Sequence, residues 1–292
     1  MDINYELYKV FYYVATTLSF SEASRRLYIS QSAVSQSIKT LEKKLNTGLF
    51  IRSTKSVQLT PEGETLLRHV EPAIHLIKQG EGHLTEAGEL DSGQLRIGAT
   101  DTICRYLLIS CLNRYHKQYP RVHIRILNQT SLNCVELLER GQVDLIVTNY
   151  PNSRMGHREK LLTIHEFQDV FAGSKSHYPE LAGKKTHLHE LLQYPILMLD
   201  RHSTTHEFLH KTFREAQLEL VPEIELDSND LLLDLASIGL GLAFVPDYCL
   251  KGRDRLFKIN LAETMPSRKV VIATNTTTPV TRAVRKFLTL FG

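Results

Sequence analysis

Five polar side chains at helical spacing form the first surface in this sequence that could do chemistry. Val34, Ile38 and Leu41 recur every three or four residues, so one face of a helix over residues 31–45 would be buried. The opposite face would present Gln31, Ser32, Ser35, Gln36 and Lys39. Amides and hydroxyls pair with base edges, and lysine pairs with phosphates, so this face is predicted to enter a DNA groove. Any amphipathic surface helix has a polar face, however, so its neighbours must support the prediction.

The elements next to this helix would position it for that role. A first helix is predicted over residues 20–27 with Ser21 as its cap, followed by a turn at residues 28–30. Ser30 is a suitable cap for the polar helix. A further apolar stripe over residues 5–15 predicts a helix that backs the pair.

Two short strands, over residues 49–52 and 57–59, are predicted to follow as a small wing. Arg52 and Lys55 would project from this wing toward the phosphate backbone or the minor groove. Two solvated surface cations are the alternative for these residues. Residues 1–60 carry a net charge of +4 and the remaining 232 residues sum to −1, so the basic excess lies with the predicted DNA-binding part.

A long helix is predicted after the wing. Thr60 supplies a capping hydroxyl and Pro61 occupies the first helical position. An apolar stripe that includes Leu66, Val70 and Ile77 then runs for about two dozen residues, until Gly80 and later glycines would loosen the helix. Such a stripe needs a partner, and the simplest partner is a second copy of the chain.

Residues 1–88 resemble the DNA-binding head and linker helix of LysR-type transcriptional regulators. The resemblance rests on FSEASRRLYISQSAVSQSIKTLEKKL, then LFIRS, then LTPEGE, in that order. Ser24 stands where the family usually has a second alanine, and Ser32 where it often has proline. The resemblance implies a winged helix-turn-helix domain over residues 1–60 and a dimerising linker helix over residues 61–90, in a dimer or tetramer. Dimer symmetry predicts double-stranded DNA with an inverted-repeat operator as partner, and RNA polymerase is a further candidate partner.

The rest of the chain, residues 91–292, alternates strands with helices and is therefore predicted to be α/β. Strands are expected over residues 94–100, 122–128 and 143–149, with helices over residues 103–119 and 132–140 between them, in a parallel sheet. A second set begins with a strand over residues 166–172. The resemblance implies an effector-binding domain like the periplasmic binding proteins, with lobe 1 at 91–163 and 268–292, lobe 2 at 164–267, and two crossing strands between them.

A ligand site is predicted where strands end and helices begin, because ligands of open α/β sheets gather there and helix N-termini favour anions. The side chains at these positions are Thr100, Thr102, Thr130, Ser131, Asn149, Ser203 and Thr204, with His202 adjacent. The resemblance implies that the first and last of these clusters face each other across an effector cleft. A small carboxylate or other anion is the expected effector. Serine and threonine are also ordinary helix caps, which need no ligand.

No catalytic motif is evident, so an enzyme is not expected. The sequence lacks G-x-S-x-G, a phosphate loop, H-E-x-x-H and a convincing pair of acids, and no cofactor is predicted. The alternative within the same class is a regulator that senses redox state or metal. Cys104 and Cys111 could carry the first role, and His202, His206 and His210 recur at metal-ligand spacing, but without a partnering motif.

The compartment is expected to be the cytoplasm. No apolar run near the N-terminus resembles a signal peptide, and no stretch approaches the roughly 18 apolar residues of a membrane span. No membrane association is predicted. The absence of a C-x-x-C pair among the four cysteines also argues against a zinc ribbon.

Overall fold

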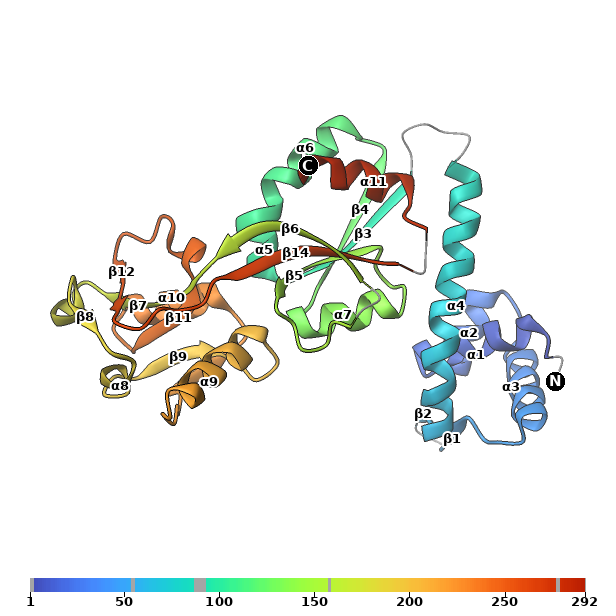
Figure 1. The fold of residues 1–292 in the computed structure, drawn as a ribbon. Coiled ribbons are helices and arrows are strands. Elements are labelled where there is room, and N and C mark those ends of the chain that lie inside the picture. The colour runs from blue at the N-terminus through green and yellow to red at the C-terminus, as the bar shows by residue number, and fades with distance from the viewer. Residues whose placement is uncertain (1–2, 54–55, 87–92, 157–158, 277–278, 292) are drawn as a thin grey trace. The chain divides into compact units, whose positions relative to one another are not determined.

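In a computed structural model the chain forms two compact units, one holding residues 1–88 and the other most of the chain that follows. The structure describes residues 3–53, 56–86, 93–156, 159–276 and 279–291. Figure 1 shows a helical unit with a long helix, and an α/β unit built on two sheets. In the described ranges, no helix combines the length and apolar character needed to cross a membrane.

The first unit packs three helices around one core (Figure 1). These are α1 (Tyr5–Thr17), α2 (Phe20–Leu27) and α3 (Gln31–Leu45), followed by the antiparallel strands β1 (Phe50–Arg52) and β2 (Val57–Leu59). The predicted cap of α2 was wrong, because the hydroxyl of Ser19, not Ser21, accepts the N–H of Glu22 at 3.1 Å. Phe20 is the first helical residue and is buried in the core, so the capping residue is the one that precedes it.

The long helix α4 (Pro61–Glu86) begins as predicted, because the Thr60 hydroxyl accepts the N–H of Gly63 at 3.0 Å. Val70 and Ile74 are buried on the core of the first unit, whereas Leu76 and Ile77 are 46% and 41% exposed. The helix continues past Gly80, where the sequence predicted loosening. A glycine costs a helix only about 1 kcal/mol, which does not by itself end it.

The first lobe of the second unit contains a five-stranded sheet in the order β4-β3-β5-β14-β6. The strands β3 (Gly93–Ala99), β4 (Val122–Asn128) and β5 (Leu145–Tyr150) are parallel, as predicted. The strands β14 (Arg268–Asn275) and β6 (Glu159–Phe167) join antiparallel to their neighbours, so the sheet is mixed.

Helices cover both faces of this sheet, with α6 and α11 on one side and α7 on the other (Figure 1). Their bounds are α6 (Ile109–Gln118), α7 (Ser131–Glu139) and α11 (Arg282–Leu288). The single helix expected over residues 103–119 is interrupted. It begins as α5 (Asp101–Ile103), passes through a π-helical segment, Cys104–Leu108, and continues as α6. π-Helical turns inside α-helices are frequent at functional sites.

The second lobe has a five-stranded sheet in the order β10-β9-β11-β7-β12. Its strands are β7 (Asp169–Ser174), β9 (Ile196–Leu199), β10 (Ile224–Leu226), β11 (Leu242–Pro246) and β12 (Leu256–Lys258). Its helices are α8 (Leu188–Leu191), α9 (Thr204–Glu215) and α10 (Asn229–Ser237), and β8 (Lys185–Thr186) pairs with β13 (Asn260–Leu261).

The chain crosses between the lobes twice, at the ends of β6 and β14. The strand β6 ends at Phe167 in the first sheet, and β7 begins at Asp169 in the second. The strand predicted over residues 166–172 therefore spans the crossing. The chain returns at Arg268, which is aligned with Phe167 in the antiparallel pair.

Candidate functional site

The polar face of α3 is built as the sequence predicts. The Ser30 hydroxyl caps the helix by accepting the N–H of Ala33 at 3.1 Å, and Val34, Ile38 and Leu41 are buried beneath it. On the other side Gln31, Ser32, Gln36 and Lys39 are exposed and Ser35 is half-buried. Four of the five predicted reading residues are therefore available at the surface.

The wing is held against α3 by one carboxylate. Glu42 accepts the N–H of Leu49 at 2.9 Å through Oε1, and its Oε2 lies 3.2 Å from Arg52. The Arg52 guanidinium also lies 4.7 Å from the ring centroid of Phe20. A guanidinium carries five N–H donors, so Arg52 keeps donors for a phosphate after these contacts. Lys55 lies outside the described residues.

Most of the predicted effector residues meet around one cleft of about 390 Å³ between the two lobes. The cleft is lined by Thr100, Thr102, Thr130, Ser131, Asn149, Ser203 and Thr204. His202 is not among the lining residues; its ring is exposed and lies 3.2 Å from Asp200. A volume of this size is in the range of small-molecule pockets.

The hydroxyls at the cleft cap helices, as the alternative interpretation of the sequence proposed. Thr100 accepts the N–H of Ile103 and Thr130 accepts that of Asn133, each at 3.2 Å. Ser203 accepts the N–H of His206 at 3.0 Å. Thr100 and Thr130 accept at their caps and still have their own hydrogens to donate, so capping and ligand binding are compatible there. The hydroxyl of Ser203 already donates its hydrogen to the carbonyl of Asp200 at 3.0 Å.

A buried ion pair behind the cleft was missed by sequence reasoning. Arg268 and Asp169 are fully buried and lie 2.6 Å apart. The same guanidinium donates to the hydroxyl of Thr204 at 2.8 Å and to that of Thr205 at 3.2 Å. Burial raises the pKa of Asp169, and the charge of Arg268 opposes that shift. One arginine at the start of a strand gives no sequence signal for this role.

Two hydrogen bonds join the lobes beside the cleft. The Asn229 amide donates to Thr102 at 3.0 Å, and Tyr106, on the π-helical segment, donates to Asp230 at 2.7 Å. Burial and the bond to Asp230 raise the pKa of Tyr106 to about 12. Asn229 was missed, although it opens a helix after a strand and so follows the rule that found Thr100 and Ser203.

The thiols are poorly placed for redox chemistry. Burial, with a smaller effect of Asp101, raises the pKa of Cys104 to about 11. Burial raises the pKa of Cys134 to about 12 and that of Cys249 further. The thiolate is the reactive form of cysteine, so these three are mostly protonated near neutral pH.

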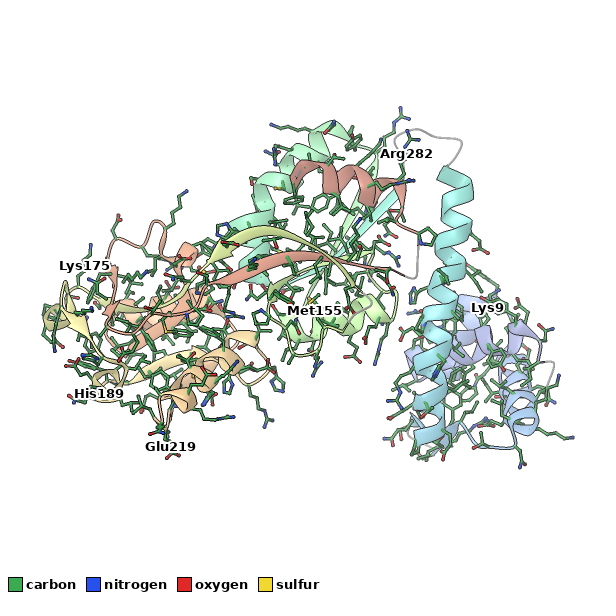
Figure 2. The ribbon with its side chains drawn as sticks, viewed as in Figure 1. Lys9, Met155, Lys175, His189, Glu219 and Arg282 are labelled. Carbon is green, nitrogen blue, oxygen red and sulfur yellow. The ribbon has the colours of Figure 1, made fainter. Side chains whose placement is uncertain are left out.

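The histidines on α9 form a close pair. The ring centroids of His206 and His210 are 4.2 Å apart, and His206 lies 3.2 Å from Glu225. Within the ranges that the structure describes, no three His, Cys, Asp or Glu side chains are arranged to hold a metal ion. His187 and His189 stack at 5.4 Å on the second lobe, where Figure 2 labels His189.

Comparison with known proteins gives two family matches that together span most of the chain. Residues 5–64 match the bacterial regulatory helix-turn-helix proteins of the lysR family, and residues 88–292 match the LysR substrate binding domain. A probable RuBisCO transcriptional regulator from Cyanophora paradoxa is 30% identical over 239 residues, which cover 80% of this chain and 72% of that protein.

Solved structures share the fold. A full-length OxyR variant from Pseudomonas aeruginosa has a TM-score of 0.76 at 20% identity and covers 98% of this chain and 94% of its own. Full-length CbnR complexed with its target DNA has a TM-score of 0.69 at 18% identity and covers 99% of both chains. The CcmR regulatory domain from Synechocystis in complex with 2-PG has a TM-score of 0.62 at 18% identity, covering 68% and 96%.

Proposed function

Since the chain belongs to the LysR family of bacterial transcriptional regulators, we propose that α3 reads an operator and that a small molecule in the cleft between the lobes controls this binding. The observation that carries the second part is the convergence of seven polar residues on one cleft where strands end and helices begin. Two proteins of the same fold support the two parts in turn, because CbnR is complexed with its target DNA and the CcmR regulatory domain with 2-PG.

For the DNA, the proposed readers are Gln31, Ser32, Ser35, Gln36 and Lys39, with Arg52 and Lys55 contacting the backbone or minor groove. Amides pair with adenine edges in the major groove, whereas cations on the wing add affinity without specificity. A dimer would place two copies of α3 on inverted half-sites about one helical turn apart. RNA polymerase is a proposed partner of the bound regulator.

Replacing Gln36 by alanine tests the reading role. Gln36→Ala is expected to weaken binding to a selected operator by about 1–3 kcal/mol and to leave binding to random DNA nearly unchanged. Fluorescence anisotropy at fixed salt measures both affinities. Gln193→Ala, an exposed glutamine of the second lobe, is the matched control. Equal losses on operator and random DNA would contradict base reading by Gln36.

For the effector, an anionic group is proposed to bind at the N-termini of α7, α9 and α10. The helix ends supply partial positive charge, and the hydroxyls of Thr100 and Thr204 retain hydrogens to donate. The effector would bind one arrangement of the lobes better than another and so shift the population of DNA-competent molecules. The raised pKa of Cys104 weighs against the redox alternative.

Thermal unfolding against small acids, with metal chelated, tests the cleft. A ligand at about 100 times its Kd adds roughly 2.7 kcal/mol and moves the midpoint by a few degrees. Thr100→Val should abolish the ligand-induced shift, measured from the variant's own midpoint. Thr289→Val, at an exposed threonine outside the cleft lining, should retain it. A shift that survives Thr100→Val unchanged would argue against this site.

A further inference from the structure

The charged side chains among the residues that line the cleft are all acidic, which an anion alone does not explain. Asp101, Asp200 and Asp227 line it, and none of its lining residues, all of them described, is lysine, arginine or histidine. The His202 ring lies 3.2 Å from Asp200, so the carboxylate of Asp200 has a partner outside the cleft lining. Asp101 and Asp227 are exposed, and their carboxylates make no ion pair or hydrogen bond within the described part of the chain. Two uncompensated negative charges therefore face the ligand space.

Two buried amide oxygens at the same cleft also lack a partner. Asn149 is 8% exposed and Asn229 is 5% exposed, and the Oδ1 atom of each accepts no hydrogen bond from any residue that the structure describes. The Nδ2 group of Asn229 is already used, because it donates to Thr102. Buried polar atoms are normally satisfied, so an unfilled acceptor at a cleft indicates a missing donor. Like the carboxylates, these oxygens would accept hydrogen bonds from N–H groups of a ligand.

Another set of groups in the cleft supplies hydrogens. The hydroxyls of Thr102 and Thr204 accept from Asn229 and Arg268, which directs their own hydrogens elsewhere. Thr100 and Thr130 accept backbone N–H groups in the same way. These four hydroxyls suit an acidic group with several lone pairs. The cleft thus offers hydrogen donors and charged acceptors together.

We propose that the effector is amphoteric: a small molecule that carries both a carboxylate and a protonated amine, as a free amino acid does. The carboxylate would accept hydrogen bonds from the threonine hydroxyls and the N–H groups at helix N-termini. The ammonium group would donate to Asp101, to Asp227 and to the amide oxygens of Asn149 and Asn229. An anion without an amine would meet the two carboxylates uncompensated. This assignment rests on the proposed function of the cleft and narrows its ligand class.

Matched sets of ligands test the proposal on the full-length protein. The panel contains free monocarboxylic amino acids, each with its deaminated acid and its decarboxylated amine; leucine, 4-methylpentanoate and 3-methylbutylamine form one such set. Thermal unfolding finds the ligands and isothermal titration calorimetry gives the Kd values. At least one amino acid should bind, and its two relatives should bind tenfold or more weakly. A panel in which no amino acid binds, or in which a deaminated acid binds equally well, overturns the proposal.

Charge variants separate this inference from the proposed function. The double variant Asp101→Asn with Asp227→Asn should raise the Kd of the amino acid at least tenfold and should lower the Kd of its deaminated acid. Asp254→Asn, an exposed aspartate outside the cleft lining, should change neither. If deaminated acids bind and Thr100→Val abolishes that binding, the cleft is the effector site and the amphoteric class is wrong. If no bound ligand responds to Thr100→Val, the proposed function of the cleft fails as well.

Discussion

At the scale of single residues, the cleft depends on a guanidinium that does not line it. Arg268 donates to Thr204 and Thr205 and is paired with Asp169, and all four residues are buried. Because the Thr204 hydroxyl accepts a hydrogen bond from Arg268, its own hydrogen must point in another direction, and the ion pair with Asp169 holds the guanidinium in place. Arg268 is thus a positioning residue for the cleft.

Removing this guanidinium should be strongly destabilising. Arg268→Met leaves the carboxylate of Asp169 buried without a cation, which costs about 3–5 kcal/mol of unfolding free energy. Urea unfolding measures the loss, with the exposed Arg255→Met as control. Combining Arg268→Met with Asp169→Leu should recover part of the stability, because no unpaired buried charge then remains. A loss below about 1 kcal/mol for Arg268→Met would be inconsistent with the buried pair.

At the scale of elements, α2, α3 and α4 of the first unit each begin after a residue whose hydroxyl caps them, and in α2 the burial of the first helical residue helps to fix that position. Ser19, Ser30 and Thr60 each accept an N–H three residues on. Two serines flank Phe20 at the start of α2, and the burial of Phe20 places Ser19, which the sequence-based prediction did not consider, at the cap and Ser21 in the exposed first turn.

Replacing each serine by alanine tests which of the two caps α2. Ser19→Ala removes the hydroxyl that accepts the Glu22 N–H and should lower stability by about 1 kcal/mol. Ser21→Ala should change it by less than about 0.5 kcal/mol, since that side chain is exposed in the first turn. Scanning calorimetry of both variants gives the comparison. Equal effects would mean that α2 does not begin as described.

The paired histidines of α9 should make stability depend on pH. Burial and the neighbouring His206 lower the pKa of His210 below 6.5, with an opposing effect of Glu225. The unfolded chain therefore binds a proton more readily than the folded chain as pH falls through about 6.5, and stability declines there. Thermal midpoints recorded from pH 7.5 to 5.5 measure this decline, and His210→Gln should make it less steep. His123→Gln, at an exposed histidine, is the control. An unchanged slope would argue against the shift.

Local signals explain most of what could be predicted from the sequence. Capping hydroxyls, Pro61 and apolar periodicity located most helices. The rule that ligands bind at the carboxyl ends of strands led to eight predicted effector residues, and seven of them line the cleft. The crossing at residue 168 could not be predicted in this way, because an extended apolar run does not specify its sheet. The pair of Arg268 with Asp169 spans 99 residues, and no local pattern encodes it.

At the scale of the whole molecule, the linker helix offers a surface for a second copy of the chain. Leu76 and Ile77 remain exposed on α4, beyond the buried Val70 and Ile74. Exposed apolar residues on a long helix are typical of helix pairs, in which each copy covers the other.

A charge on this surface should weaken self-association. Ile77→Asp is expected to raise the dimer dissociation constant at least tenfold, because an aspartate would be buried against the partner helix. Sedimentation velocity across a concentration series measures the change. Leu192→Asp, on a similarly exposed leucine of the second lobe, is the control. A dimer that is unaffected by Ile77→Asp would place the interface elsewhere.

The position of β14 also has a consequence for synthesis. This strand lies between β5 and β6 in the first lobe, although residues 169–261 of the second lobe precede it in the chain. A growing chain can complete the second sheet while the first still lacks its inner strand, since domains form as their segments leave the ribosome. The first lobe must wait for residues 268–275, so a nascent regulator acquires its DNA-binding unit well before it can acquire a finished cleft.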